Sequence, residues 1–157
     1  MNATGSENTA AIGSINDIAG TINIKGGTIN ATGSGDYASG IGCGCKFGSA
    51  TVNITGGTVN AISGLYAPGI SSYGSTLGGF YGTVTITGGY VFAKGLQTYA
   101  YGIGANNKFG NDKQGTLIIG AEGKKIRLTQ GWDTWDYTTP TDISTKSRTS
   151  EMLIETL

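Results

Sequence analysis

The acidic residues are the first candidates for chemistry, because general acid and base catalysis on a sugar needs two carboxyl groups held close together. No Asp or Glu occurs between Tyr37 and Asn111, and the chain has no His. We therefore expect no catalytic residues and no enzymatic activity, and for the same reason no Ca²⁺ site. The acids before the C-terminal tail stand at unrelated positions of the sequence; they are Glu7, Asp17, Asp36, Asp112 and Glu122.

Two cysteines, Cys43 and Cys45, form a Cys-x-Cys pair. Two thiols without a His or a second Cys pair make a weak metal site, and this spacing is poor for a disulfide. Alternation along a strand from Ile41 points both thiols to the same side as Ile41. We therefore expect two buried thiols, no bound metal and no cofactor.

Tyrosines are the strongest candidates for a binding surface. Tyr37, Tyr66 and Tyr99 each stand four residues before an isoleucine of a repeated Gly-Ile motif, and Tyr101 lies close by. If the copies stack, the rings form a row on which the apolar faces of sugars can lie. Alternatively, the rings pack on one another and brace a loop. We predict Tyr37, Tyr66, Tyr99 and Tyr101 as ligand contacts and leave the packing alternative open. Further aromatic residues mark the second and third copies as the contact side; they are Tyr73, Phe80, Tyr81, Tyr90 and Phe92.

An internal repeat provides the elements that position these residues. Three segments align, TINIKGGTINATGSGDYASGIG from Thr21, TVNITGGTVNAISGLYAPGIS from Thr51 and TVTITGGYVFAKGLQTYAYGIG from Thr83. A fourth copy begins at Thr116 as TLIIGAEGKKIRL. The letters NATGS occur at residues 2–6 and again at 30–34, so part of an earlier copy precedes Thr21. The regular spacing of these copies along the chain indicates a repeat architecture.

Each unit holds three short candidate strands. The first alternates Thr or Asn with apolar residues, which predicts one buried and one exposed face. A Gly-Gly pair follows and permits the positive φ of a tight corner. The second strand alternates again, and the third is a short Ala-x-Gly-Ile stretch. Its isoleucines fall at the same position of every copy; they are Ile12, Ile41, Ile70 and Ile103.

One unit cannot enclose its own apolar side chains, whereas stacked units can. We therefore predict an all-β fold, a single-stranded, right-handed parallel β-helix of about four to five rungs. The repeats occupy residues 1–128, with units starting near 21, 51, 83 and 116 and a partial unit before 21. The alternative is a sandwich of antiparallel hairpins joined by Gly-Gly turns.

The pattern I-x-I-x-GG-T-I/V-x-A-x-G followed by A-x-G-I-G resembles the Gly-rich β-helical repeats of large surface proteins of Gram-positive gut bacteria. Those proteins are described as adhesin-like or carbohydrate-binding-like. The resemblance covers residues 2–128, although the third copy has Tyr90 and Phe92 where the second has Thr and Asn. It implies an extracellular or cell-wall-associated protein whose partner is a glycan or another surface protein.

The tail, residues 129–157, has a different composition, with both tryptophans and half of the ten carboxylates. Open β-helix ends expose unpaired strands, so we expect this tail to act as a C-terminal cap. Trp132, Trp135 and Tyr137 are expected to lie across the last rung, or alternatively to form an aromatic glycan platform. Residues 144–157 are expected to form a short helix with Leu153 and Leu157 on one face.

Composition excludes several classes of function. A net charge of zero argues against a nucleic-acid partner. No run approaches the roughly 20 apolar residues of a membrane-spanning helix, and no leader peptide follows Met1. Because the chain opens on part of a repeat, we expect a longer parent protein or self-association through an open N-terminal rung.

We therefore predict a non-enzymatic, adhesin-like β-helix segment that binds a glycan or a protein. The alternatives are a polysaccharide-active β-helix lyase or hydrolase and a purely structural stalk. An ice-binding face of Thr and Asn is disfavoured, because the fourth copy reads Thr116-Leu117-Ile118.

Overall fold

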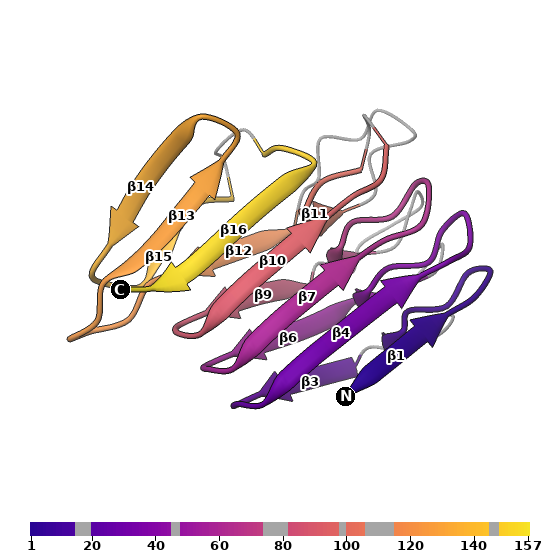
Figure 1. Ribbon diagram of the computed structural model, residues 1–157, viewed down its shortest axis with the longest axis horizontal. Helices are drawn as coiled ribbons and strands as arrows, with labels where there is room; N and C mark the ends of the chain where they lie inside the picture. The colour runs from indigo at the N-terminus through magenta and orange to yellow at the C-terminus, as the bar shows by residue number, and fades with distance from the viewer. Residues whose placement is uncertain (15–19, 45–47, 74–81, 98–99, 106–114, 145–147) are drawn as a thin grey trace.

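The computed structural model describes residues 1–14, 20–44, 48–73, 82–97, 100–105, 115–144 and 148–157, and these form three β-sheets (Figure 1). Sheet A has the spatial order β1 (Asn2–Gly5), β4 (Thr28–Gly33), β7 (Thr58–Ile62), β10 (Tyr90–Lys94), β16 (Glu151–Thr156), β13 (Ile126–Gln130) and β14 (Asp133–Tyr137). Sheet B is ordered β2 (Ile12–Ser14), β5 (Ile41–Cys43), β8 (Ile70–Tyr73) and β11 (Ile103–Ala105). Sheet C is ordered β3 (Gly20–Ile24), β6 (Ala50–Ile54), β9 (Thr83–Ile86), β12 (Thr116–Ile119) and β15 (Thr141–Asp142).

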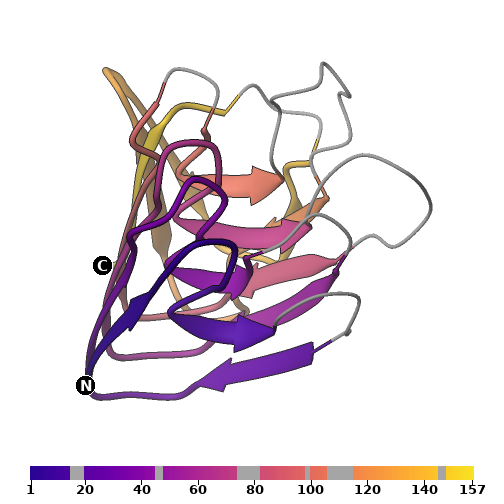
Figure 2. The same ribbon diagram turned by 90° about the vertical axis from the view of Figure 1, so that its right-hand side faces the viewer.

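Equivalent strands of successive copies pair in parallel and in register. Thr51 lies beside Thr21 and Thr83, and Thr83 lies beside Thr116. The isoleucines of the third strand form one column, in the order Ile12, Ile41, Ile70 and Ile103. This confirms the in-register stacking that the repeat predicts, and the antiparallel sandwich is wrong for the repeats. Figure 2 shows the copies following one another along a single axis from the N-terminal end.

The alternating residues build one apolar core. In β6 and β7, the residues at every second position are buried, and the intervening Thr and Asn face outward. Val52, Val59 and Ile70 come from the three different sheets and are fully buried in the same cluster. A strand that alternates in this way has one side available for packing, so three such faces together exclude water.

The Gly-Gly corners have the backbone that the sequence predicts. The second glycine of each pair has a positive φ, 82° at Gly27, 92° at Gly57 and 98° at Gly89. This region of backbone space is costly for residues with a Cβ atom. These corners join β3 to β4, β6 to β7 and β9 to β10, each time leading from sheet C to sheet A.

The C-terminal strand departs from the predicted helix. Glu151–Thr156 forms β16, which lies antiparallel between β10 and β13. Without β16, the edge of β10 has unpaired backbone groups, and strand pairing satisfies them. The segment also alternates, because Met152 and Ile154 are fully buried while Leu153 faces the other side. The helix prediction is therefore wrong: period-two burial and an available sheet edge outweigh local helix propensity.

The aromatic residues of the tail differ in their burial. The side chain of Trp132 is completely exposed, so the expectation that it lies across the last rung is wrong. Trp132 lies in the tight turn between β13 and β14, and its side chain is outside the core. Trp135 and Tyr137 are half-buried and pack against the core cluster. Leu157 is also exposed.

A buried arginine lies where the tail meets sheet B. Arg148 is only 6% exposed, and its Nη2 donates a hydrogen bond to the Gly115 carbonyl at 3.1 Å. Its Nη1 lies 3.5 Å from the carbonyl oxygen of Ile103 in β11. Burial lowers the pKa of Arg148 to about 10, so the guanidinium still carries its charge at neutral pH.

The N-terminal end presents the outer edges of β1, β2 and β3. Ile12, Ile22 and Ile29 are only partly buried there, whereas Ile41, Val52 and Val59 in the next copy are fully buried. Self-association through this end stays a prediction, as do the number of rungs, their handedness and the division of the chain at residue 128. No helix among the described residues is long and apolar enough to span a bilayer.

Candidate functional site

Two of the predicted tyrosines meet. The rings of Tyr37 and Tyr66 lie with their centroids 5.6 Å apart at an interplanar angle of 37°. Their loops also stack, because the Tyr66 amide donates to the Asp36 carbonyl at 2.7 Å. Both side chains are half-buried. This geometry is that of rings bracing successive loops, and it leaves their role in ligand contact a prediction.

The other two predicted tyrosines are Tyr99 and Tyr101. Tyr99 lies outside the described residues. Tyr101 is half-buried on the loop before β11, and its carbonyl accepts a hydrogen bond from the Gly69 amide at 3.2 Å. The Tyr101 side chain interacts electrostatically with Arg148. Among the predicted tyrosines, the structure brings together the rings of Tyr37 and Tyr66.

The burial of Cys43 agrees with the prediction of buried thiols. Cys43 is buried, with 2% of its surface exposed, on the same strand as Ile41. Cys45 lies outside the described residues. Among the described residues, no group of three or more His, Cys, Asp or Glu side chains is placed to hold a metal ion.

A groove lies on the outer face of sheet A, where the regular repeats meet the tail. It has a volume of about 530 Å³ and is open to solvent. Strands β10, β16 and β13 form its floor, and the turn between β13 and β14 rises at one end. Its lining residues are Tyr90, Phe92, Thr129, Gly131, Trp132, Glu151 and Leu153.

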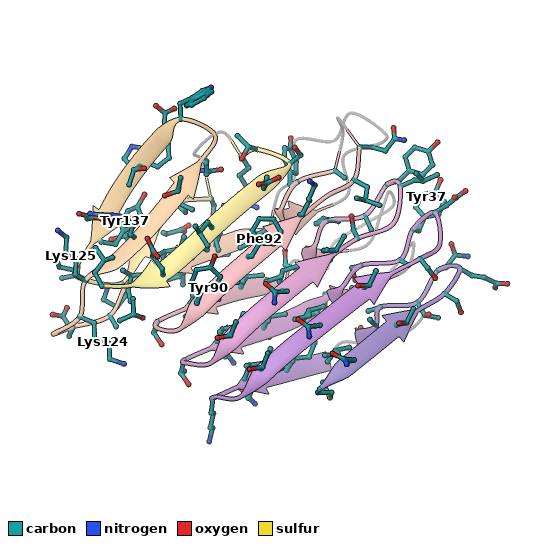
Figure 3. All side chains as sticks on the ribbon, viewed as in Figure 1. Tyr37, Tyr90, Phe92, Lys124, Lys125 and Tyr137 are labelled. Atoms are coloured by element: carbon teal, nitrogen blue, oxygen red, sulfur yellow. The ribbon has the colours of Figure 1, made fainter. Side chains whose placement is uncertain are left out.

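Apolar and aromatic side chains dominate this groove. Tyr90 is 42% exposed, and Phe92 and Leu153 are partly exposed beside it. The Cα atoms of Phe92 and Leu153 are partners across the β10–β16 pair, so these side chains stand next to each other on one face. Figure 3 shows Tyr90 and Phe92 on β10, away from Tyr37 on its loop. Such an aromatic surface facing solvent is typical of a contact site.

Polar groups accompany the aromatic residues. Glu151 Oε2 forms an ion pair with Lys94 Nζ at 3.3 Å, and both side chains stay substantially exposed. On the opposite side, Thr129 Oγ1 lies 3.4 Å from Thr134 Oγ1. Carboxylate and hydroxyl oxygens of this kind can accept hydrogen bonds from a ligand.

An ionic cluster flanks the groove on β13 and β14. Asp136 accepts hydrogen bonds from Arg127 Nε at 2.8 Å and Nη2 at 3.1 Å, and it lies 2.8 Å from Lys125 Nζ. The hydrogen bond from Arg127, followed by that from Lys125, holds the pKa of Asp136 well below its usual range. Lys125 lies near one end of the strand pair, beside Tyr137 (Figure 3). Because these charged side chains are exposed, their ion pairs should contribute little to the free energy of unfolding.

Two acidic residues that are far apart in the sequence line one cavity elsewhere on the molecule. Glu7 and Asp36 both line an open cavity of about 530 Å³ at the N-terminal end, together with Ser6, Asn8, Ser34 and Gly35. The sequence analysis placed these acids at unrelated positions. The pairing of β1 with β4 brings Gly5 beside Gly33, which stacks the loops that follow and brings the two acids to one cavity.

Part of the groove is predictable from the sequence. Tyr90 and Phe92 are expected on a contact side, and a glycan platform is the alternative for the tail tryptophans. Leu153 and Glu151 are not predicted as groove residues, because both lie within the helix expected for residues 144–157. The period-two pattern of Met152 and Ile154 is the signal that could have identified β16.

Comparison with known proteins supports the repeat. The family model for the Beta helix repeat matches residues 22–45, 52–75 and 84–107. Each match covers one strand from each of the three sheets, so the chain contains a β-helix repeat region. Comparison with curated proteins and with solved structures gave no match.

Proposed function

We propose, with the β-helix repeat region as the premise, that this chain is a non-enzymatic binding module whose groove on sheet A receives a neutral glycan. The observation that carries the proposal is the fully exposed Trp132 at one end of a groove floored by Tyr90, Phe92 and Leu153. The C–H faces of sugar rings are apolar, and they pack on aromatic faces while their hydroxyls stay hydrated or hydrogen-bonded.

Burial of these rings can make one substantial contribution to the affinity for a glycan. If a ligand covers roughly 100 Å² of apolar surface on Trp132 and its neighbours, the burial contributes about 2.5 kcal/mol at 25 cal/mol per Å². Glu151 and Thr129 then supply acceptors for sugar hydroxyls at the edge of the apolar surface. The groove therefore offers both the apolar platform and the polar edge that a glycan requires.

The dimensions of the groove favour a glycan over a protein partner. Its volume of about 530 Å³ lies within the range of small-molecule sites, roughly 300–1,000 Å³. A stable protein interface needs about 800 Å² from each partner. A protein ligand would therefore have to extend far beyond the aromatic residues that mark this site.

Removing the exposed indole provides the first test. We expect Trp132→Ala to weaken binding to the glycans that the unmodified protein selects on a neutral glycan array by roughly tenfold or more. Because the side chain is completely exposed, the melting temperature should stay within about 1 °C of the unmodified protein.

The variant Tyr66→Ala is the matched control for this test, because it removes a ring from the Tyr37–Tyr66 pair outside the groove. We expect Tyr66→Ala to retain full glycan affinity. If Tyr66→Ala abolishes binding while Trp132→Ala does not, the tyrosine loops are the site and the groove assignment is wrong.

A second candidate function rests on Glu7 and Asp36, which line one cavity. Paired carboxylates are the groups that glycoside hydrolysis uses, so a polysaccharide-cleaving enzyme would act there. Our proposal predicts no release of reducing sugar from plant or mucin polysaccharides. Release that disappears in both Glu7→Gln and Asp36→Asn would establish the enzymatic alternative.

We infer a structural role for the tail from the same contacts. Strand β16 covers the edge of β10, β15 covers the edge of β12, and Arg148 bonds to carbonyls of Gly115 and Ile103. These contacts support a C-terminal cap, and the β-helix that it would close is proposed to be right-handed with about four to five rungs. A cap of this kind would keep the groove at the end of a rigid rod.

The proposed location is extracellular or cell-wall-associated, and adhesion is the proposed context for glycan binding. This part of the proposal is supported by the resemblance of the repeats. Protease treatment of intact source cells should remove the chain, and its complete protection in intact cells would contradict this location.

A further inference from the structure

The row of cross-strand partners that contains the groove residues Phe92 and Leu153 continues into a ladder of asparagines. On the outer face of sheet A, Leu153 is the Cα partner of Phe92, and Phe92 is the partner of Asn60. Asn60 is in turn the partner of Asn30, and Asn30 of Asn2. The apolar floor of the groove therefore continues directly into a row of amide side chains that crosses the strands.

Hydrogen bonds fix the amides of this ladder, which we define as Asn60, Asn30 and Asn2. Asn60 Nδ2 donates to Asn30 Oδ1 at 2.9 Å, and Asn30 Nδ2 donates to Asn2 Oδ1 at 2.8 Å. Each primary amide has a second N–H and a second acceptor lone pair beyond those used within a ladder. Asn2 and Asn30 are exposed and Asn60 is half-exposed, so these groups face solvent in a fixed arrangement.

The strands that carry the ladder have no charged side chain, and a nearby charge at β4 is the N-terminal ammonium of Met1, which donates to the Thr28 carbonyl. The strands β1, β4 and β7, which the structure describes completely, have the sequences NATG, TINATG and TVNAI and contain no charged residue. The outward neighbours of the ladder are threonines and Ile62, which are short compared with the aromatic side chains of β10. A charged polymer would find no counter-charge among the side chains of these strands, whereas a neutral polyol would find repeated donors and acceptors.

We propose that the ligand is a linear, neutral oligosaccharide or polysaccharide whose chain crosses the strands and extends from the groove onto the asparagine ladder. This inference rests on the proposed glycan-binding function and specifies its substrate class. Neighbouring strands lie about 4.8 Å apart, a distance close to the advance of an extended glycan per hexose. Successive sugars therefore meet successive strands, first on the aromatic floor and then on the amides. Because the amides are already fixed, binding does not have to order them.

Sheet C contains a natural control. Asn53 Nδ2 donates to Asn23 Oδ1 at 3.0 Å, which forms a similar amide pair on a different sheet. The next residue in that column is Thr85, so the pair does not lead into an aromatic groove. A change at Asn53 therefore removes the same chemistry without touching the proposed binding track.

The experiment measures dissociation constants by titration calorimetry for cello-, xylo- and manno-oligosaccharides, each from the disaccharide to the octasaccharide. We expect at least one series to bind with an affinity that rises roughly tenfold from the shortest to the longest member, as one or two added hydrogen bonds would give. In Asn30→Ala and in the more conservative Asn30→Thr, the long members should lose this gain while the disaccharide keeps its affinity. Asn53→Ala should bind every member as the unmodified protein does.

The outcomes separate this inference from the function on which it rests. If affinity depends on Trp132 but not on chain length, or if Asn30→Ala and Asn30→Thr both keep the gain, the ladder inference is overturned and the groove stands. If no series binds, or if binding does not need Trp132, both proposals fail. Thermal unfolding of each variant verifies that the exposed substitutions leave the fold intact.

Discussion

Gly42→Ala should strongly destabilise the fold, because neither the backbone conformation nor the packing at this position accommodates a Cβ atom. Gly42 has a φ of 112°, and a Cβ atom built on it would lie 1.8 Å from the Ser71 carbonyl oxygen of the next copy. That oxygen belongs to the backbone of the paired strand β8, so rotation of a side chain cannot relieve the contact. The unfavourable φ and the overpacking together should cost about 3–5 kcal/mol, which is a large share of the roughly 5–15 kcal/mol that stabilises an ordinary domain.

Gly26→Ala is the matched control for Gly42→Ala. No heavy atom lies within 4 Å of a Cβ built at Gly26. We expect its free energy of unfolding to change by no more than about 0.5 kcal/mol. Urea denaturation followed by far-UV circular dichroism measures both variants. Equal stability of Gly42→Ala and the unmodified protein would show that the rungs do not stack in the register described.

Ile154→Asn should have the second large effect, because β16 joins the repeats to the tail. Ile154 is fully buried and pairs with Val91 on one side and Leu128 on the other. The substitution removes a buried aliphatic side chain and places an amide in the core, where its hydrogen-bonding groups are left without partners. We expect a loss of about 4 kcal/mol or more in the free energy of unfolding.

The neighbouring residue gives the control for Ile154→Asn. Leu153 lies on the outer face in the groove, so Leu153→Asn should cost about 1 kcal/mol or less in stability. It should instead weaken glycan binding. Denaturant unfolding distinguishes the two variants, and similar destabilisation by both would contradict the alternating burial of β16.

The repeats could be predicted because the residue patterns that determine their structure are short and recur in each copy. The alternation around Val52 and Val59 and the Gly-Gly pair between them recur in each copy, so one unit determines how the next one stacks. The isoleucine column and the positive φ at Gly27 follow from the same pattern. Family-model matches in three copies agree with this part of the prediction.

The tail could not be predicted in the same way, because its structure depends on distant partners. No other segment repeats the sequence EMLIET, and nothing near it in the chain identifies β10 as its neighbour. The predicted helix used the spacing of Leu153 and Leu157, whereas the structure buries Met152 and Ile154. The groove depends on this strand, so its complete lining could not be assembled from the sequence.

The third copy departs from the repeat pattern at the proposed groove. Tyr90 and Phe92 occupy the positions held by Thr58 and Asn60 in the neighbouring strand. Large aromatic side chains on an exposed strand face gain little for folding, so their presence beside β16 suggests a contact that selects them. The asparagine ladder ends at Phe92, which is the place where the polar track and the apolar floor meet.

The most direct test of glycan binding by the groove is NMR titration of the isotope-labelled protein with the oligosaccharide that binds best. The side-chain amide signals of Asn30 and Asn60 and the indole N–H of Trp132 report on the ligand track, and the indole of Trp135 reports on the side packed against the core. We predict that the first three signals shift together with one dissociation constant while the signal of Trp135 stays in place. Saturable binding that leaves those three signals unmoved and shifts the resonances of Tyr37 and Tyr66 would contradict the account.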